Sequence, residues 1–291
     1  MSTNIEKDPH TGVETTGHEW DGIRELDNPA PKWLMYIFYA TIVWSIGYWV
    51  LYPAWPNLFG GGYTKGILGY SQREVIAEQM TLHLEDQAGV RAVIAAATPD
   101  DIRANPDLLA FALAGGRVAF ADNCAGCHGS GGAGNPGFPA LVDDDWVWGG
   151  NLAEIQHTIQ YGIRNPHPEA RYSEMPKFGL DGILTRAEIA DTAEYVLSLS
   201  GRATDPAAVL RGQPVFEEQC VACHGSAGEG LRELGAPRLS DAIWIYGGSK
   251  EKIVESITNS RFGVMPAWTG RLDESTIKQL TVYVHALGGG E

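Results

Sequence analysis

Two C-x-x-C-H motifs are the residues of this sequence most clearly arranged for chemistry. They are Cys124-Ala-Gly-Cys127-His128 and Cys220-Val-Ala-Cys223-His224, and together they use all four cysteines of the 291-residue chain. Two thiols at this spacing can form thioether bonds to the two vinyl groups of one porphyrin, and the adjacent histidine becomes the proximal ligand of the iron. The motifs therefore predict two covalently bound haem c groups.

Other uses of paired cysteines fit this pattern poorly. A thioredoxin-like redox pair needs one C-x-x-C in a βαβ setting and no following histidine. A zinc site built from both pairs would have to span the 92 residues between Cys127 and Cys220, far beyond the usual separation of about 15–20. We therefore expect haem attachment in both motifs, with Cys124 and Cys127 holding the first haem and Cys220 and Cys223 the second.

The second axial ligand of each iron is expected to be a methionine. Only two of the five methionines, Met175 and Met265, follow the motifs, and a proline comes directly after each. His/Met ligation raises the reduction potential of the iron relative to His/His ligation. We expect the axial pairs His128 with Met175 and His224 with Met265. The rival ligands in this part of the chain are His157, His167 and His285.

A repeat surrounds the two motifs and indicates how they are positioned. Gly116 and Phe120 before the first motif match Gly212 and Phe216 before the second, and further pairs follow in register: Pro139 and Pro237, Trp146 and Trp244, Ile155 and Ile253, Tyr195 and Tyr283. Two copies of one haem-binding unit follow from this periodicity. The predicted fold is all-α, with tandem class I-like cytochrome c domains at residues 107–201 and 202–291.

Other side chains of the repeats are candidates for the haem surroundings. Trp146, Trp148 and Trp244 are expected at the edges of the haem pockets. Arg164 is a candidate partner for a haem propionate, with a solvated side chain as the equal alternative. We expect each C-terminal tyrosine of a repeat to cross the helix that enters the haem motif.

A single membrane anchor is predicted near the N-terminus. Residues 33–52 carry no charge over 20 positions, enough for a helix of about 30 Å that spans the hydrocarbon core. The stretch is too long for a signal peptide, and no A-x-A cleavage site follows it. Haem c is attached on the outer side of the bacterial inner membrane, so we expect a cytoplasmic tail at 1–32 and a periplasmic linker with a helical stalk at 53–106.

The charge balance restricts the possible partners. The chain has 21 Lys and Arg against 36 Asp and Glu, a net charge of −15, and no basic run. Nucleic acid is therefore not expected as a partner. A basic redox protein would be attracted electrostatically, although the acidity can equally serve only to keep the domains soluble.

The order of these features resembles a known family. The run from Trp20 to Pro29 before one anchor, followed by two C-x-x-C-H-G units that each have a Met-Pro pair, is similar to the membrane-anchored dihaem subunit of cbb3-type cytochrome c oxidases. The resemblance covers essentially the whole chain. It implies an inner-membrane electron-entry module without an active site of its own.

The same resemblance implies the partners of the chain. Electrons would come from a soluble or membrane cytochrome c and pass through a monohaem subunit to the haem–copper catalytic subunit of a proton-pumping oxidase. Two other functions stay open on the residues alone. A dihaem cytochrome c peroxidase would need one iron open to hydrogen peroxide with an acid/base residue nearby, and the chain could also serve another membrane oxidoreductase.

Overall fold

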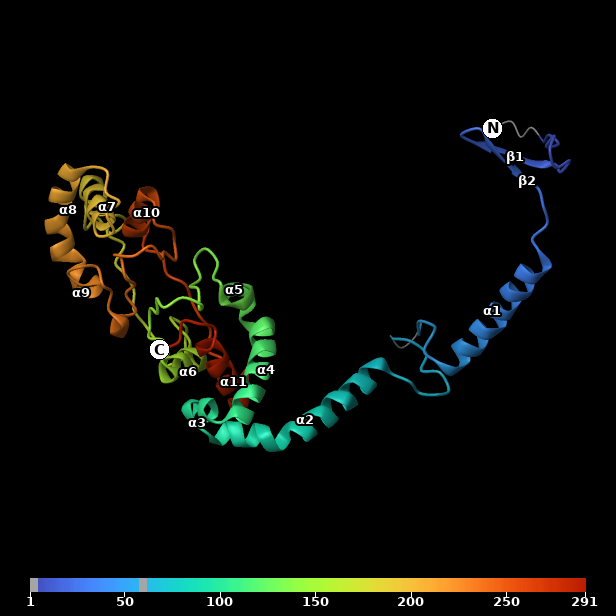
Figure 1. The fold of residues 1–291 in the computed structure, drawn as a ribbon, viewed down its shortest axis with the longest axis horizontal. Helices are drawn as coiled ribbons and strands as arrows, with labels where there is room; N and C mark the ends of the chain where they lie inside the picture. The colour runs from blue at the N-terminus through green and yellow to red at the C-terminus, as the bar shows by residue number, and fades with distance from the viewer. Residues whose placement is uncertain (1–4, 58–61) are drawn as a thin grey trace. The chain divides into compact units, whose positions relative to one another are not determined.

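The computed structural model describes residues 5–57 and 62–291. Its contacts divide the chain into two compact units, residues 1–86 and 87–291 (Figure 1). The expected tail at 1–32 and linker at 53–106 include residues 1–4 and 58–61, which lie outside the described residues.

The first unit begins with a small β-hairpin that the all-α expectation did not include. Strand β1 (Thr15–Trp20) pairs antiparallel with β2 (Ile23–Leu26). The two residues between them, Asp21 and Gly22, have φ angles of 50° and 83°. Positive φ at both central positions is what a type I′ hairpin turn requires, and Asp-Gly favours that turn. The local turn chemistry therefore explains the sheet.

Helix α1 (Lys32–Leu51) of the first unit coincides with the predicted anchor to within one residue. It begins directly after Pro31 and ends before Tyr52, whose backbone is extended. None of its residues is buried, and its 20 residues correspond to about 30 Å of helix. Among the described residues it is the one helix long and apolar enough to cross a membrane.

The two C-x-x-C-H motifs lie among the helices of the second unit. The helices from the unit boundary onward are α2 (Gln72–Ala96), α3 (Pro99–Ala104), α4 (Pro106–Asn123), α5 (Ala125–His128), α6 (Leu152–Tyr161), α7 (Arg186–Ser198), α8 (Pro206–Gln219), α9 (Val221–His224), α10 (Lys250–Asn259) and α11 (Glu274–His285). Helix α2 starts in the first unit. Asn105 and Asp205 cap α4 and α8, each with proline at the first helical position, a favourable N-terminus.

The helices of the two repeats are exchanged between two lobes. Helix α4 of the first repeat packs on α11 of the second, and α7 of the first packs on α8 of the second (Figure 1). Helix α6 also packs on α11, and α10 also packs on α7. We call α4, α5, α6 and α11 lobe 1, and α7, α8, α9 and α10 lobe 2. The repeats 107–201 and 202–291 thus do not each form one lobe, contrary to the expectation from the sequence.

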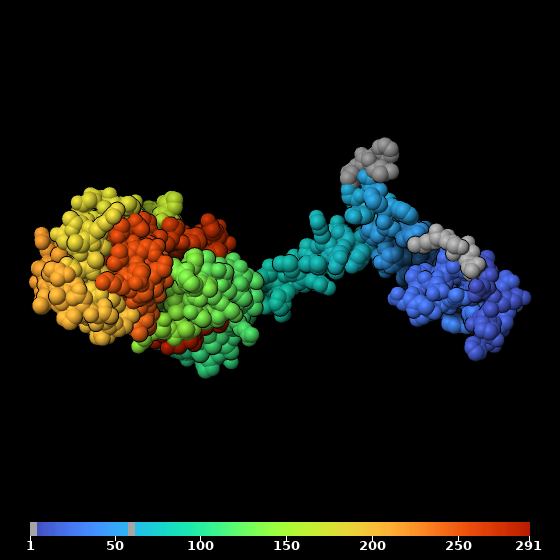
Figure 2. All heavy atoms as spheres, turned by 90° about the horizontal axis from the view of Figure 1, so that it is seen from above, coloured from blue at the N-terminus to red at the C-terminus, as the bar shows by residue number. Residues whose placement is uncertain are grey.

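Two connections carry the chain between the lobes. The chain leaves lobe 1 after α6 through residues 162–185 and returns after α10 through residues 260–273. Both connections begin with a sharp change of direction, since Gly162 and Ser260 have φ angles of 71° and 54°. Figure 2 shows green atoms of the first repeat meeting orange-red atoms of the second across one continuous surface. The first connection contains Met175 and the second contains Met265, so the path of each connection decides in which lobe its methionine lies.

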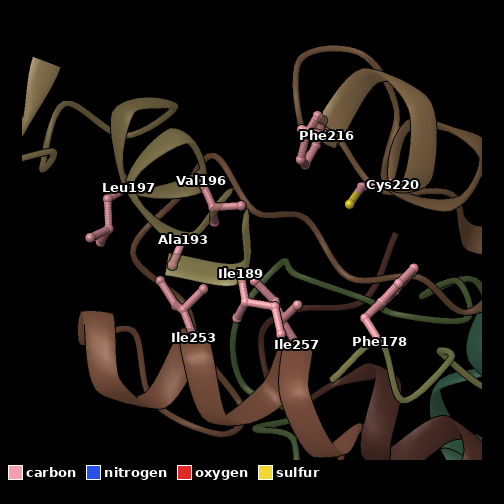
Figure 3. Close-up of a cluster of buried hydrophobic side chains, with 9 residues drawn as sticks. All are labelled: Phe178, Ile189, Ala193, Val196, Leu197, Phe216, Cys220, Ile253 and Ile257. Atoms are coloured by element: carbon pink, nitrogen blue, oxygen red, sulfur yellow. The ribbon is translucent and has the colours of Figure 1, made fainter. Parts of the chain in front are cut away.

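Each lobe has its own apolar core, and both cores combine the two repeats. In lobe 2, Phe216 and Cys220 of the second repeat lie with Ile189 and Val196 of the first, as Figure 3 shows. The corresponding residues of lobe 1 are Phe120, Ile155, Ile159, Ile277, Leu280 and Val284. Burying each large apolar side chain stabilises the fold by about 1.5–3 kcal/mol. The two cores therefore stabilise the fold in which the repeats contribute helices to both lobes.

Candidate haem-binding sites

Each C-x-x-C-H motif lies at the end of a long helix and forms a single helical turn. The backbone N–H of Cys124 donates to Phe120 at the end of α4, and that of Cys220 donates to Phe216 at the end of α8. The four thiols are not joined in disulfides. The first cysteine of each motif lies toward the core and the second is exposed, so both motifs present two free thiols at equivalent positions.

The two histidines are oriented for iron. His128 Nδ1 lies 3.0 Å from the carbonyl oxygen of Pro139, and His224 Nδ1 lies 2.9 Å from that of Pro237. A ring whose Nδ1–H donates to a carbonyl leaves Nε2 as the lone-pair donor, the usual arrangement of a metal-bound histidine. Burial lowers the pKa of both imidazoles, which favours the neutral form that can bind a metal.

The loops after the motifs repeat the same backbone pattern. Gly134 N–H donates to His128 O at 2.6 Å, and Gly230 N–H donates to His224 O at 2.8 Å. Gly134 has φ 80°, and a Cβ there would lie 2.9 Å from the backbone nitrogen of Ala140. Glycine at this position therefore permits the close passage of backbone that holds the histidine in place.

One apolar cavity connects both motifs. Its lining includes the cysteines and histidine of each motif together with Met175 and Met265. Thr192, whose buried hydroxyl has no hydrogen-bond partner among the described residues, also lines it. A largely apolar cavity with thiols, imidazoles and thioethers along its wall has the donor set of covalently bound haem. The residues present therefore fit two haem c groups.

The methionines lie in the lobes opposite to those expected. Met265, from the second repeat, packs in the lobe 1 core with Phe120 and Cys124. Met175, from the first repeat, packs in the lobe 2 core with Phe216 and Cys220. The physical reason is the exchange of helices, because each connection between the lobes carries its methionine across with it. The structure thus groups Met265 with the His128 motif and Met175 with the His224 motif.

The rival histidines lie away from the cavity. His157 meets the ring of Tyr161 edge-on and His167 stacks on it, with centroid distances of 4.9 Å in both pairs. His285 Nε2 lies 2.9 Å from the carbonyl oxygen of Glu291. In the part of the chain that the structure describes, none of the three is among the residues lining the cavity.

The tryptophan expectations are partly met. Trp148 and Trp244 line the cavity, whereas Trp146 packs on the lobe 1 core and donates its indole N–H to Gly289 O. Trp268 also lines the cavity but was not singled out from the sequence. Trp268 lies three residues after Met265. Its closeness in sequence to a candidate ligand could have identified it.

One carboxyl group that lines the cavity has a raised pKa. Burial, followed by the nearby carboxylates of Asp241, Asp143 and Asp144, raises the pKa of Asp145 to about 6, while Arg238 opposes this shift. Asp145 and Arg238 both line the cavity. The site therefore contains a carboxyl group that changes charge just below neutral pH.

Two consecutive residues of the connection after α6 also contact the methionine segments. The guanidinium of Arg164 donates to Gly263 O and to Ser173 O, and the amide of Asn165 donates to Met265 O. From the sequence, Arg164 was a candidate only as a propionate partner, and Asn165 was not a candidate at all. Both roles depend on the crossing of the chain between lobes, which residue types alone do not reveal.

Comparison with known families matches three successive parts of the chain. Residues 12–58 match the N-terminal domain of cytochrome oxidase-cbb3, FixP. Residues 113–200 match the cytochrome c family, and residues 207–284 match cytochrome c oxidase, cbb3-type, subunit III. The two haem-binding repeats are therefore confirmed as tandem cytochrome c domains in sequence.

Curated relatives match almost the whole chain. The cbb3-type cytochrome c oxidase subunit CcoP of Azospirillum brasilense is 55% identical over 98% of this chain and 99% of its own length. The subunit FixP of Azorhizobium caulinodans is 52% identical and CcoP of Cereibacter sphaeroides 49% identical, both over 100% of the two chains. Similarity at this level extends from the hairpin to the last helix.

Proposed function

Because this chain belongs to the family of CcoP and FixP subunits of cbb3-type cytochrome c oxidases, we propose that it accepts electrons from a cytochrome c and relays them toward the oxygen-reducing core. The observation that carries this proposal is the pair of equivalent sites, each with two free thiols, an oriented imidazole and a methionine. Haem c, when bound, supplies a reversible one-electron iron couple.

The axial ligands that we propose are crossed between the repeats. His128 with Met265 would ligate the haem held by Cys124 and Cys127, since these residues share lobe 1. His224 with Met175 would ligate the haem held by Cys220 and Cys223 in lobe 2. This replaces the pairing in chain order that the sequence suggested. In each site the histidine and methionine would together hold the iron and leave no position open to another ligand.

Helix α1 supports a single crossing of the membrane. We propose that it crosses the inner membrane once, with the hairpin in the cytoplasm and residues 53–291 in the periplasm, where haem c is attached. The monohaem cytochrome subunit and the haem–copper catalytic subunit of a proton-pumping oxidase would then be its partners. The net charge of −15 favours a basic donor cytochrome through electrostatic steering, which weakens as salt increases.

Purification of the full-length protein from its membrane tests this function. The expected result is co-purification with a haem–copper subunit and oxygen consumption on reduced cytochrome c. A chain beginning at residue 53 is the matched control, since it keeps both haem sites and lacks α1. It should be a soluble red protein that does not assemble with the complex; full-yield assembly would show that the anchor is not the assembly element.

Small ligands distinguish electron transfer from peroxidase chemistry. If His and Met close both irons, carbon monoxide should bind neither ferrous haem of the intact subunit. Rapid turnover of hydrogen peroxide together with a high-spin absorption spectrum from one haem would contradict the proposal, because a peroxidase needs one open coordination position.

A further inference from the structure

Arg164 lies where the chain crosses from lobe 1 to lobe 2, and its side chain contacts both segments that carry the candidate methionine ligands. Its Nε donates to Gly263 O at 2.7 Å, and its Nη1 donates to Ser173 O at 3.0 Å. Gly263 precedes Met265 by two residues, and Ser173 precedes Met175 by two residues. The guanidinium therefore binds equivalent carbonyl groups in the two segments that carry the methionines.

The surroundings of Arg164 favour this positioning role over charge pairing. No carboxylate lies within ion-pair distance of Arg164 in the described residues. The side chain is half-buried, lines the cavity and lies over the ring of Phe262 at 5.6 Å from its centroid. Burial lowers the pKa of its guanidinium. The guanidinium of Arg164 therefore contacts two backbone carbonyl groups and one aromatic ring. These contacts hold the side chain and the two backbone segments in place and pair no charge.

The backbone of Arg164 is held in a conformation that arginine rarely adopts. Its φ is 51°, a region that costs a non-glycine residue roughly 1–3 kcal/mol and persists only where the surroundings enforce it. Arg164 N–H donates to Arg171 O at 2.8 Å, and Ile163 exchanges two backbone hydrogen bonds of 3.0 Å with Met265. This backbone conformation places the side chain between the two segments.

The neighbouring residue makes a natural comparison because it holds one segment only. The amide nitrogen of Asn165 donates to Met265 O and to Tyr161 O, at 2.8 Å each. No hydrogen bond joins Asn165 to the segment of Met175 among the described residues. A change at Asn165 therefore disturbs one ligand segment, whereas a change at Arg164 disturbs two.

We propose that Arg164 is a positioning residue that holds both methionine segments at once, so that the iron–sulfur bonds of the two haems depend on one guanidinium. This inference rests on the proposed function, because it takes Met175 and Met265 as the axial ligands. Planar guanidinium can donate two hydrogen bonds at a fixed angle, which the ammonium group of lysine cannot reproduce. Electron transfer through the two haems would then share one structural support.

The test uses the full-length, haem-loaded protein and three substitutions. R164K keeps the charge and loses the two-pronged donor. R164N removes the side chain but suits the left-handed backbone, since asparagine tolerates positive φ. N165A is the matched control at the next position. The measurements are the far-red charge-transfer absorption of the ferric Met–iron bond, carbon monoxide binding to the ferrous protein, and the midpoint potential of each haem.

We expect R164K and R164N to lose the Met–iron absorption from both haems, to bind carbon monoxide at both and to lower both potentials. N165A should do so at one haem only. Covalent haem content and far-ultraviolet circular dichroism check that each variant has folded. If R164N does not fold, R164K decides, because an effect of charge alone would leave R164K unchanged.

Two results would overturn parts of this account separately. Wild-type absorption and potentials in R164K would end the role of Arg164 while leaving the ligand assignment intact, and so would a change confined to one haem. A wild-type protein without any Met–iron absorption would instead contradict the proposed ligands themselves.

Discussion

The ring of Phe120 in the first repeat packs against the ring of Tyr283 in the second, with their centroids 5.5 Å apart. Tyr195 of the first repeat packs in the same manner on Phe216 of the second, at 5.0 Å. The predicted contact between the C-terminal tyrosine and the helix entering the haem motif is therefore present, but each tyrosine meets the phenylalanine of the other repeat. This exchange places the two candidate haem sites in one compact unit, residues 87–291.

The exchange predicts a specific energetic coupling. In a double-mutant cycle with F120L and Y283L, the free energies of unfolding should be non-additive by about 0.5–1.5 kcal/mol, the usual value for an aromatic pair. Denaturant unfolding of the haem-loaded chain beginning at residue 53 measures it. The control cycle combines F120L with Y195L, whose rings lie in different lobes, and should be additive; coupling in the control cycle instead would contradict the exchange.

The glycines where α4 packs on α11 and α8 packs on α7 predict that a larger residue would destabilise the fold. A Cβ on Gly116 would lie 2.6 Å from the Cβ of Tyr283, and a Cβ on Gly212 would meet the backbone of Asp191. G116A and G212A should each lower the free energy of unfolding by about 1–3 kcal/mol through overpacking. G89A is the control: nothing lies near that position on α2, and alanine there should stabilise the helix by about 0.5–1 kcal/mol.

Glu194 predicts an acid dependence of stability. Its buried carboxylate on α7 accepts hydrogen bonds from Lys250 Nζ and from the backbone and hydroxyl of Thr204. The hydrogen bond from Lys250 is the largest cause that lowers the Glu194 pKa to about 2, from an ordinary 4.5. The folded state therefore gains stability above the ordinary pKa and loses it as pH falls toward 2.

Substitution of Glu194 checks this sign. E194Q should reduce the free energy of unfolding at pH 7 by about 1.5–3 kcal/mol, the scale of hydrogen bonds to a charged group. The difference from wild type should shrink as pH falls below about 4.5. E218Q, at an exposed position of α8, should stay within about 0.5 kcal/mol at all pH values. An E194Q effect independent of pH would contradict the assignment.

Asp145 predicts a pH dependence of the haem potentials. Because its pKa is raised to about 6, the carboxyl group becomes negative as pH rises through 6, and negative charge in the cavity favours ferric iron. A midpoint potential should therefore fall across this range, because two unit charges interact by about 4 kcal/mol at 4 Å in an effective dielectric constant of about 20, and by less as their separation grows. Redox titration from pH 5 to 7.5 measures it.

Two variants separate this effect from general surface charge. D145N should abolish the dependence near pH 6. D144N, at the exposed neighbouring position, should keep the pH dependence but move it to slightly lower pH. The reason is that the substitution removes one of the charges that raise the pKa of Asp145. Potentials of wild type that do not vary with pH would exclude coupling to Asp145.

Local residue patterns were sufficient to predict the anchor helix and the helices that lead into the two C-x-x-C-H motifs. The uncharged stretch corresponds to α1, and the matched residues before each C-x-x-C-H motif correspond to α4 and α8. The roles of His128 and His224 were predicted from their adjacency to the cysteines, and the carbonyls of Pro139 and Pro237 supply the orientation. In these cases the information lies within a few residues along the chain.

The pairing between repeats could not be predicted in the same way. Phe120 can pack on Tyr195 or on Tyr283 with the same chemistry, because both repeats carry the same residue types at these positions. Which one it meets depends on the path of residues 162–185, where Gly162 and Arg164 turn the chain into the other lobe. The positions of the two methionines follow from that path, so chain order gave a different pairing.

The most direct test of the crossed sites is an experimental structure of the haem-loaded protein at a resolution that shows the axial ligands. We predict that the sulfur of Met265 lies on the iron bound by His128, and that of Met175 on the iron bound by His224. Met175 found opposite His128 would contradict the account.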